Sequence, residues 1–224
     1  MSKISEQLVR QFADIGTISH YDGNVVLIHQ GATDRVVFLL VSGCVKITAQ
    51  LDNGNTALLA IRAGGDVVGE LAVVDGHERS ATVRTCSPTV AITLDAARFA
   101  ETLGPDVAAW LALMGAISAK FRAAIRRHTD HTGTTKVVAL ARVLVELATT
   151  YGDTSSGTGL VIGINLNQAE WATLIGASEA TAHRALTDLR IQGLITTRNR
   201  RMIVRDLDRL RAVAYPDTPS NDGQ

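Results

Sequence analysis

The N-terminal half of the chain alternates short, β-branched apolar runs with turn residues. The apolar runs cover residues 25–28, 36–41, 45–49, 56–61 and 90–94. Runs of this length, bounded by Gly, Asp and Asn, predict strands, and the Asn53-Gly54 pair between two of them is typical of a hairpin turn. The short spacing favours an antiparallel sandwich or barrel over alternating strands and helices, and residues 5–12 before it can form a short amphipathic helix.

After Pro105 the apolar positions recur every three or four residues, which predicts a long helix over about residues 106–128. The members of this apolar seam are Trp110, Met114, Ile117, Phe121 and either Ala124 or Ile125. Such a seam can pack on its own domain or pair with the same helix of a second chain, and its small residues favour the pair. Residues 128–134 break the pattern and predict a hinge, and a second helix is expected over residues 136–150.

Composition narrows the class of protein. The 224 residues allow one large or two modest domains, and 46% hydrophobic with 20% charged residues is typical of a soluble globular protein. No apolar run approaches the roughly 20 residues that span a bilayer, and residues 1–6 lack a secretion signal, so we expect a cytoplasmic protein with no membrane partner.

Cys44 and Cys86 lie in apolar stretches and are expected to be reduced. The polar cluster at residues 128–131 is assigned no metal.

The net charge of the whole chain is zero, but basic and acidic residues are not evenly distributed along it. The chain has 22 basic and 22 acidic residues, which taken alone argues against nucleic acid as a partner. Residues 1–100 carry 8 basic and 10 acidic side chains, whereas residues 176–205 carry six Arg against only Glu179 and Asp188. This local excess of positive charge indicates nucleic-acid binding by the C-terminal part of the chain.

A glycine-containing stretch over residues 65–83 has the chemistry of a small anion site. Gly69 allows close backbone approach, a short helical turn after it would present its positive end, and Arg79 beside Ser80 supplies donors suited to phosphate. Glu70 would repel a phosphate but can accept a hydrogen bond from a ribose hydroxyl. Spacing alone leaves open whether this stretch is a binding site or a surface turn with an ordinary Arg.

Two capped helices are predicted in the C-terminal part. Asn167 and Glu170 form a capping-box pattern, Gly176 ends the first helix, and Ser178 caps the second. A hairpin with a basic tip follows over residues 194–204. The spacing predicts a helix–turn–helix with a wing, whose second helix would lie in the major groove of DNA; a purely structural helix pair is the alternative.

Together the two motifs resemble the CRP/FNR family of bacterial transcription regulators over about residues 8–213. Gly69-Glu70-Leu71 followed by Arg79-Ser80-Ala81 is similar to the phosphate cassette of the cyclic-nucleotide-binding β-roll. The resemblance implies an α+β fold with three parts: a β-roll (a double-stranded jelly roll) over residues 1–104, a dimerisation helix and hinge over residues 105–132, and a winged helix–turn–helix over residues 133–224.

The resemblance also implies a ligand site in the β-roll. Arg79 and Ser80 would bind the cyclic phosphate, Glu70 the ribose 2′-hydroxyl, and backbone groups near Gly69 the ring oxygens. An apolar floor would come from Val68 and Leu71. The expected effector is a cyclic nucleotide, with cAMP as the first candidate or a similar phosphorylated ligand in its place, and no resident cofactor is expected.

On the DNA side, the second helix would read bases near its N-terminal end. Arg184 suits a guanine edge, because bidentate Arg to guanine is the commonest specific contact. The other candidate contacts, on the helix and the wing, are Ser178, Glu179, Thr181, His183, Arg198, Arg200 and Arg201. The expected partners are double-stranded DNA, a second copy of the chain through the long helix, and RNA polymerase.

The chain departs from the family pattern in two places. Glu179 and Ala180 stand where cAMP-responsive members have Arg and Glu, so the operator should differ from the usual one. Counting along the chain puts Ala124 and Ile125 where a hydroxyl pair would contact adenine, which leaves the nucleobase of the effector open. The oxygen-sensing branch is not expected, because its iron–sulfur cluster needs four Cys ligands and the chain has two.

Two alternatives to a ligand-controlled regulator stay open. A regulator of the same fold with a vestigial cassette would bind DNA independently of cyclic nucleotide. An enzyme acting on a phosphorylated small molecule would need a nucleophile–base pair or a metal cluster beside Arg79, and the sequence offers neither, so no enzymatic activity is expected.

Overall fold

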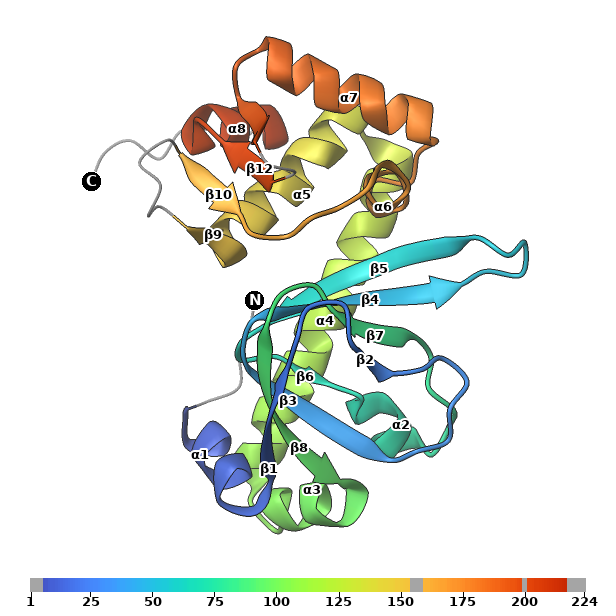
Figure 1. The fold of residues 1–224 in the computed structure, drawn as a ribbon, viewed down its shortest axis with the longest axis vertical. Helices are drawn as coiled ribbons and strands as arrows, with labels where there is room; N and C mark the ends of the chain where they lie inside the picture. The colour runs from blue at the N-terminus through green and yellow to red at the C-terminus, as the bar shows by residue number, and fades with distance from the viewer. Residues whose placement is uncertain (1–5, 154–158, 199–200, 217–224) are drawn as a thin grey trace. The chain divides into compact units, whose positions relative to one another are not determined.

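A computed structural model gives the fold and describes residues 6–153, 159–198 and 201–216. The chain forms two compact units that divide between Ile125 and Arg126 (Figure 1). Each unit has its own sheets and its own core, so each is described by itself.

The N-terminal unit is built on two four-stranded antiparallel sheets. The strands are β1 (Thr17–Tyr21), β2 (Val26–Ile28), β3 (Val36–Ser42), β4 (Cys44–Gln50), β5 (Thr56–Ala63), β6 (Val67–Val68), β7 (Thr82–Thr85) and β8 (Thr89–Asp95). Their order is β1-β8-β3-β6 in one sheet and β2-β7-β4-β5 in the other. The predicted antiparallel sandwich is confirmed. The apolar pattern does not reveal β1 and β7, which are rich in polar residues, or β6, which has two residues.

The alternating side chains of β3 divide between two cores. Phe38 and Leu40 pack with Val45 of β4 in a cluster that draws on both sheets, so the two sheets face each other. Val37 and Leu39 belong to a second cluster, which includes the helices. Because successive side chains on a strand point to opposite faces, burial on both sides fixes the register of β3.

Three helices contribute to the second cluster of the N-terminal unit. They are α1 (Glu6–Ile15), α3 (Ala96–Leu103) and the first half of α4 (Val107–Gly133). Phe12 of α1 and Phe99 of α3 stack with their ring centroids 5.7 Å apart, and Leu113 and Ala116 of α4 join the same cluster. The predicted N-terminal helix and the predicted long helix are both present.

Helix α4 is longer than the sequence pattern predicts. It runs to Gly133, so the hinge predicted over residues 128–134 is wrong: all of that stretch except Thr134 is helical. The polar His and Thr residues there cost a helix only tenths of a kcal/mol each, roughly, whereas a true break usually needs Gly or Pro. The chain instead turns at Thr134 and Thr135, and the Thr135 hydroxyl caps the next helix.

One face of α4 is apolar and exposed in the single chain. The exposed large apolar side chains of α4 are Val107, Trp110, Leu111, Met114, Phe121 and Ile125. Ile117, also predicted in the seam, instead packs partly against the core. By length and composition α4 is the one helix among the described residues that could cross a membrane. Its opposite face, however, carries Leu113 and Ala116 into the core of the unit.

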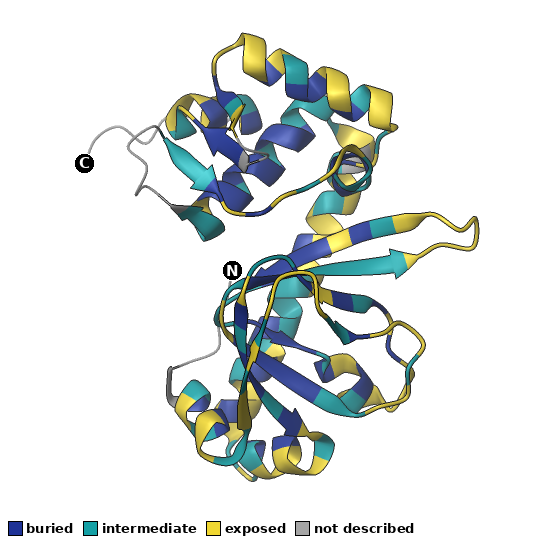
Figure 2. Ribbon diagram, in the orientation of Figure 1, coloured by how far each residue is buried: buried dark blue, intermediate teal, exposed yellow. Residues whose placement is uncertain are grey.

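The C-terminal unit combines four further helices with a small antiparallel sheet. Its elements are α5 (Lys136–Tyr151), β9 (Gly152–Asp153), β10 (Leu160–Ile162), α6 (Gln168–Leu174), α7 (Glu179–Ile191), β11 (Ile195–Arg198), β12 (Arg201–Val204) and α8 (Leu207–Ala214). The sheet order is β11-β12-β10-β9. Figure 2 shows α5 largely buried and α7 with broad exposed stretches. This arrangement confirms the predicted winged helix–turn–helix.

Candidate functional site

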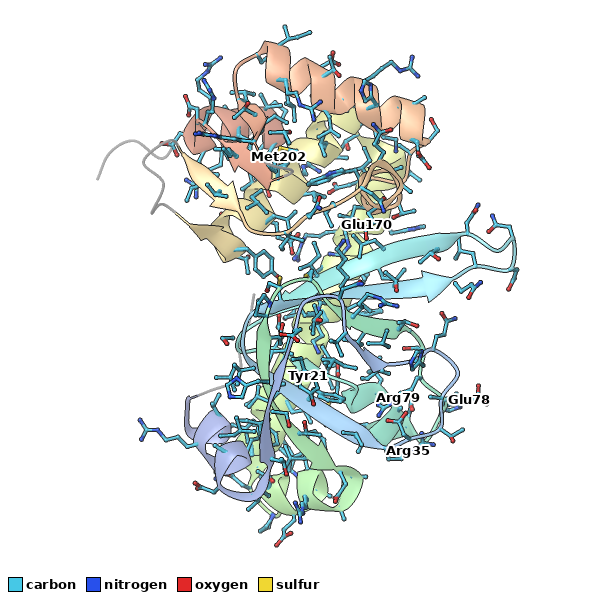
Figure 3. The ribbon with its side chains drawn as sticks, viewed as in Figure 1. Tyr21, Arg35, Glu78, Arg79, Glu170 and Met202 are labelled. Carbon is cyan, nitrogen blue, oxygen red and sulfur yellow. The ribbon has the colours of Figure 1, made fainter. Side chains whose placement is uncertain are left out.

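Arg79 is a buried arginine whose guanidinium is held from several directions. Its side chain is 2% exposed, and Figure 3 shows it beside α2 (Glu70–Asp75). Nη2 donates to the Asp34 carboxylate at 2.5 Å and to the Val36 carbonyl at 2.7 Å, and Nη1 donates to the Gly69 carbonyl at 2.7 Å. A buried charge needs such partners, because removal from water is costly without them.

Asp34 is the counter-ion of Arg79, and no sequence signal points to it. Its side chain is half-exposed, and Nε of Arg79 also approaches it at 3.5 Å. The hydrogen bond from Arg79 lowers the pKa of the Asp34 carboxyl, so Asp34 is a carboxylate at neutral pH. An anionic ligand that approaches Arg79 therefore meets a negative charge already in place.

Gly69 allows the close packing around Arg79. Its φ is +87°, a conformation that side chains rarely adopt, and a Cβ there would lie 2.7 Å from the Val36 carbonyl oxygen and 2.9 Å from Arg79 Nη1. Only glycine therefore fits between these two groups. The predicted short helical turn begins directly after Gly69 as α2. The predicted approach of its backbone to an anion stays a prediction.

Glu70 is buried and paired with Lys120 of α4. Lys120 Nζ lies 2.7 Å from Glu70 Oε1 and also donates to the Val67 carbonyl at 2.6 Å. The Glu70 and Lys120 side chains are 6% and 19% exposed, so this ion pair is largely removed from water. Sequence reasoning missed the pair, because fifty positions separate the two residues and Lys120 resembles a charged flank of the apolar seam.

The other predicted cassette residues are placed differently. Ser80 is exposed next to Arg79, Val68 is buried in the core between the sheets, and Leu71 is 46% exposed. Of the predicted apolar floor, only Val68 thus lies inside the fold. The polar groups suit a ligand that carries both an anionic group and a hydroxyl, because Arg79 supplies positive charge and an ionised Glu70 only accepts hydrogen bonds.

Helices α6 and α7 have the caps that the sequence predicts. Asn167 Oδ1 accepts from the Glu170 backbone N–H at 2.8 Å, and Glu170 Oε2 accepts from the Asn167 backbone N–H at 2.8 Å. Ser178 Oγ accepts from the Thr181 backbone N–H at 3.2 Å. Gly176, in the turn between the helices, has a φ of +59°. These contacts fix the start of each helix.

Ser178, Thr181 and Arg184 form a hydrogen-bonded row on α7. The Ser178 and Thr181 hydroxyl oxygens lie 2.9 Å apart, and Arg184 Nη2 donates to Thr181 Oγ1 at 3.3 Å. Glu179 and His183, the remaining candidates on this helix, are both exposed. The row orients the Arg184 side chain while leaving further donors available to a DNA groove.

The wing is a hairpin of β11 and β12 that pairs as far as Arg198 opposite Arg201. Arg198 is exposed, whereas Arg200 and the side chain of Arg201 lie outside the described residues. Arg190 Nη2 donates to Thr197 Oγ1 at 3.4 Å, which links α7 to the wing. The sequence does not reveal this link, because there Arg190 is only one of several Arg residues that give this stretch its excess of positive charge.

Comparisons with known proteins match both units. The family described as "Cyclic nucleotide-binding domain" matches residues 18–105, and the family described as "Crp-like helix-turn-helix domain" matches residues 138–213. The two matches lie in the same order as the two motifs of the sequence, and together they span most of the chain.

Relatives match across both units as well. The chain is 27% identical over 188 residues to a CRP-like cAMP-activated global transcriptional regulator of Mycobacterium tuberculosis, covering 84% of this chain and 83% of that protein. It is 25% identical over 194 residues to the cAMP-activated global transcriptional regulator CRP of Escherichia coli, covering 84% and 89%. The solved structure of FixK2 from Bradyrhizobium japonicum shares the fold, with a TM-score of 0.75 at 18% identity over 89% of this chain and 97% of that one.

The matches agree with the geometry of each unit: a β-roll that places a buried arginine in its cassette, and a capped helix–turn–helix with a wing. On these grounds the chain belongs to the CRP/FNR family of DNA-binding transcription regulators, which are not enzymes.

Proposed function

We propose that this DNA-binding regulator acts as a homodimer and is controlled by a cyclic nucleotide, or a similar small phosphorylated ligand, at the β-roll. The observation that carries the proposal is the buried Arg79 at the cassette, with the hydroxyl-accepting Glu70 nine positions before it. In this assignment Arg79 and Ser80 bind the phosphate and Glu70 binds a ribose hydroxyl. Val68, Gly69 and Leu71 complete the set of ligand contacts.

The nucleobase of the proposed effector is inferred from the relatives and from α4. cAMP is the first candidate, because the relatives from Mycobacterium and Escherichia are described as cAMP-activated. Ala124 and Ile125 on α4 are exposed and offer no hydroxyl to adenine. We therefore propose a cyclic nucleotide as the class of effector, with cAMP and cGMP as the first two to test.

The proposed dimer uses the exposed apolar face of α4. Phe121 is 67% exposed and Leu111 is 68% exposed, and side chains of this size are seldom left in water along a whole helix face. Pairing of two α4 helices would bury them at heptad-like spacing. The division of the chain into a sensor (residues 1–104), a dimerisation segment (105–132) and a DNA-binding domain (133–224) is part of the same proposal.

The Glu70–Lys120 ion pair provides a route from ligand to helix. In the proposed mechanism, a ribose hydroxyl that donates to Glu70 shares this carboxylate with Lys120 of α4. The ligand therefore changes the negative charge that faces Lys120. Because α4 carries Lys120, it is the first element outside the cassette to respond. The response reaches the DNA-binding unit because α4 runs on without a break to Gly133.

On DNA, we propose that the N-terminal half of α7 reads bases and the wing contacts phosphates. Arg184 would read a guanine edge, and Ser178, Glu179, Thr181 and His183 would lie along the groove. Wing contacts would come from Arg198, Arg200 and Arg201. Contact with RNA polymerase and action in the cytoplasm are further parts of the proposal, supported by the family.

Calorimetric titration of the full chain with cAMP and with cGMP tests the ligand assignment. We expect measurable binding of at least one of them. Glu70→Gln should weaken it by roughly tenfold, because a hydrogen bond to a charged group contributes about 1.5–3 kcal/mol. Arg84→Gln, which changes an exposed arginine on β7, is the matched control and should leave binding unchanged. No heat with either nucleotide would remove the ligand half of the proposal.

A vestigial cassette is the second candidate, and the internal ion pairs favour it. All three guanidinium nitrogens of Arg79 donate within the fold, and Glu70 is neutralised by Lys120. A cassette whose Arg79 and Glu70 side chains are already paired within the fold can be stable without a ligand. This candidate predicts operator binding whose affinity is the same with and without nucleotide.

A further inference from the structure

The two cysteines of the chain meet across neighbouring strands. In the ladder between β4 and β7, Val45 lies opposite Thr85, so Cys44 and Cys86 are the next pair along. The Cys86 backbone N–H donates to the Cys44 carbonyl at 2.9 Å, which continues the ladder to this pair. The two sulfur atoms lie 2.9 Å apart. Cysteines 42 positions apart in sequence are thus direct neighbours in the fold.

The surrounding backbone holds the two thiols in register. Gly43 has a φ of +79°, and a Cβ there would lie 2.4 Å from the Pro88 carbonyl oxygen, so the turn before Cys44 packs directly on the chain after Cys86. The Cys44 backbone N–H donates to Ser87 Oγ at 3.2 Å. The two sulfurs therefore stay in contact as a consequence of the sheet and its turns.

The charge state of the pair suits redox chemistry. The hydrogen bond with Cys86 is the main cause that lowers the pKa of the Cys44 thiol to about 7, with help from Ser87 and Lys46. The same hydrogen bond raises the pKa of the Cys86 thiol, and burial adds to this shift. Near neutral pH Cys44 is thus partly ionised beside the Cys86 thiol, and the thiolate is the form that reacts with oxidants.

Two alternatives explain the pair less well. A buried cysteine can serve as a small apolar core residue, but core packing does not require two sulfurs in mutual contact. A metal site would need further ligands, and the described part of the chain holds no group of three His, Cys, Asp or Glu residues that could bind an ion. Cys44 is buried and Cys86 is partly exposed, so a small oxidant would approach the Cys44 sulfur from the side of Cys86.

We propose that Cys44 and Cys86 form a reversible dithiol–disulfide site in the N-terminal unit, with a peroxide as the oxidant. The Cys44 thiolate attacks hydrogen peroxide, the O–O bond breaks, and Cys44 becomes a sulfenic acid as hydroxide leaves. The Cys86 sulfur then attacks the Cys44 sulfur, the S–S bond forms, and the S–O bond breaks. The thiol proton leaves with the hydroxyl as water, and each cysteine has lost one electron.

The disulfide would join the end of β7 to the start of β4. β7 begins at Thr82, two residues after Ser80, so the crosslink would lie at the far end of the strand that follows the cassette arginine. A reducing thiol reverses it by exchange. The site is independent of the proposed cyclic-nucleotide function, since none of its atoms belongs to the assigned ligand contacts.

The experiment treats the reduced full-length protein with hydrogen peroxide and counts free thiols by alkylation and intact mass. The count is unambiguous because the chain has two cysteines. We expect labelling to fall from two thiols to none, the mass to fall by two hydrogens, and peptide mapping to find Cys44 joined to Cys86 within one chain. Dithiothreitol should restore both labels.

Single variants separate the steps. Cys86→Ser leaves Cys44 without a resolving thiol, so peroxide should yield a sulfenic acid that dimedone traps. Cys44→Ser should react more slowly than Cys86→Ser, by at least tenfold at pH 7. The hydroxyl introduced by Cys86→Ser can still donate to the Cys44 thiolate, whereas Cys44→Ser leaves only the Cys86 thiol, whose pKa is raised. The proposal is overturned if the wild-type protein keeps both labels, gains oxygen without losing two hydrogens, or forms only disulfides between chains.

Discussion

The Lys120 ammonium lies 2.7 Å from the Glu70 carboxylate, and both groups are largely removed from water. Lys120→Met leaves Glu70 buried without its cation, so the free energy of unfolding in urea should fall by about 3 kcal/mol. Arg122→Met changes an exposed cation on the same helix and should alter stability by less than about 0.5 kcal/mol.

Combining Lys120→Met with Glu70→Gln separates the ion pair from the contribution of each residue. The double variant removes both charges, so it should recover most of the stability lost in Lys120→Met alone. Strictly additive losses in the urea series would show that the two side chains do not interact and would remove the proposed route from cassette to α4.

Asp34→Asn should strengthen cyclic-nucleotide binding. The substitution removes a negative charge beside Arg79, where the ligand phosphate is expected, and because Asp34 is half-exposed we expect a gain of roughly three- to tenfold. Calorimetry provides the dissociation constant, and Asp75→Asn, an exposed acid on α2, serves as the control. Weaker binding by Asp34→Asn would mean that Asp34 orients Arg79 for the ligand instead of competing with it.

Arg184→Ala should weaken binding to a selected operator and relax its sequence preference at one base pair. A bidentate Arg–guanine contact contributes about 1–3 kcal/mol of discrimination. Arg211→Ala removes an exposed arginine of α8 and is the control. It should leave the sequence preference unchanged and affect at most the salt-dependent, sequence-independent part of binding. Fluorescence anisotropy with single-base operator variants provides the comparison, and an unchanged preference would take Arg184 out of base recognition.

Phe121→Glu should convert the proposed dimer to a monomer. Two charges would face each other across paired α4 helices, and the apolar seam would lose its most exposed aromatic ring. Sedimentation equilibrium at several concentrations gives the mass directly. Ile18→Glu, which changes an exposed apolar residue on β1, should leave the mass unchanged; a wild-type protein that is itself monomeric would contradict the proposed interface.

Alkylation of Cys44 should depend on pH with a midpoint near 7. Only the thiolate reacts, so the rate should rise as pH increases through the lowered pKa of about 7. In Cys86→Ala the main stabilising hydrogen bond is gone, and the midpoint should move up toward the ordinary value of 9.0. An unchanged midpoint in that variant would show that Cys86 does not activate Cys44.

Much of the fold can be predicted from the sequence because its patterns are local. The capping box at Asn167 and the Ser178 cap depend on residues three positions apart, and both are present as predicted. The break predicted over residues 128–134 is wrong, because polar composition alone does not end a helix and α4 continues to Gly133.

The partners within the cassette could not be predicted, because they are distant in sequence. Asp34 reaches Arg79 from 45 positions away, and Lys120 reaches Glu70 from another helix. The contact between Cys44 and Cys86 likewise depends on the register of β4 and β7, and β7 is too polar for the apolar pattern to reveal. Hydrophobic periodicity predicts where helices and strands lie along the chain. Which side chains pair between these elements depends on the topology of the fold.

In the proposed function, a ligand bound at the β-roll controls binding to DNA. The most direct measurement is the affinity of the full-length protein for an operator selected from a random pool, with and without saturating cAMP or cGMP at fixed salt. We expect at least a tenfold increase in affinity with one nucleotide, and loss of that increase in Glu70→Gln. An affinity that is the same in all conditions would contradict ligand control and leave a regulator with a vestigial cassette.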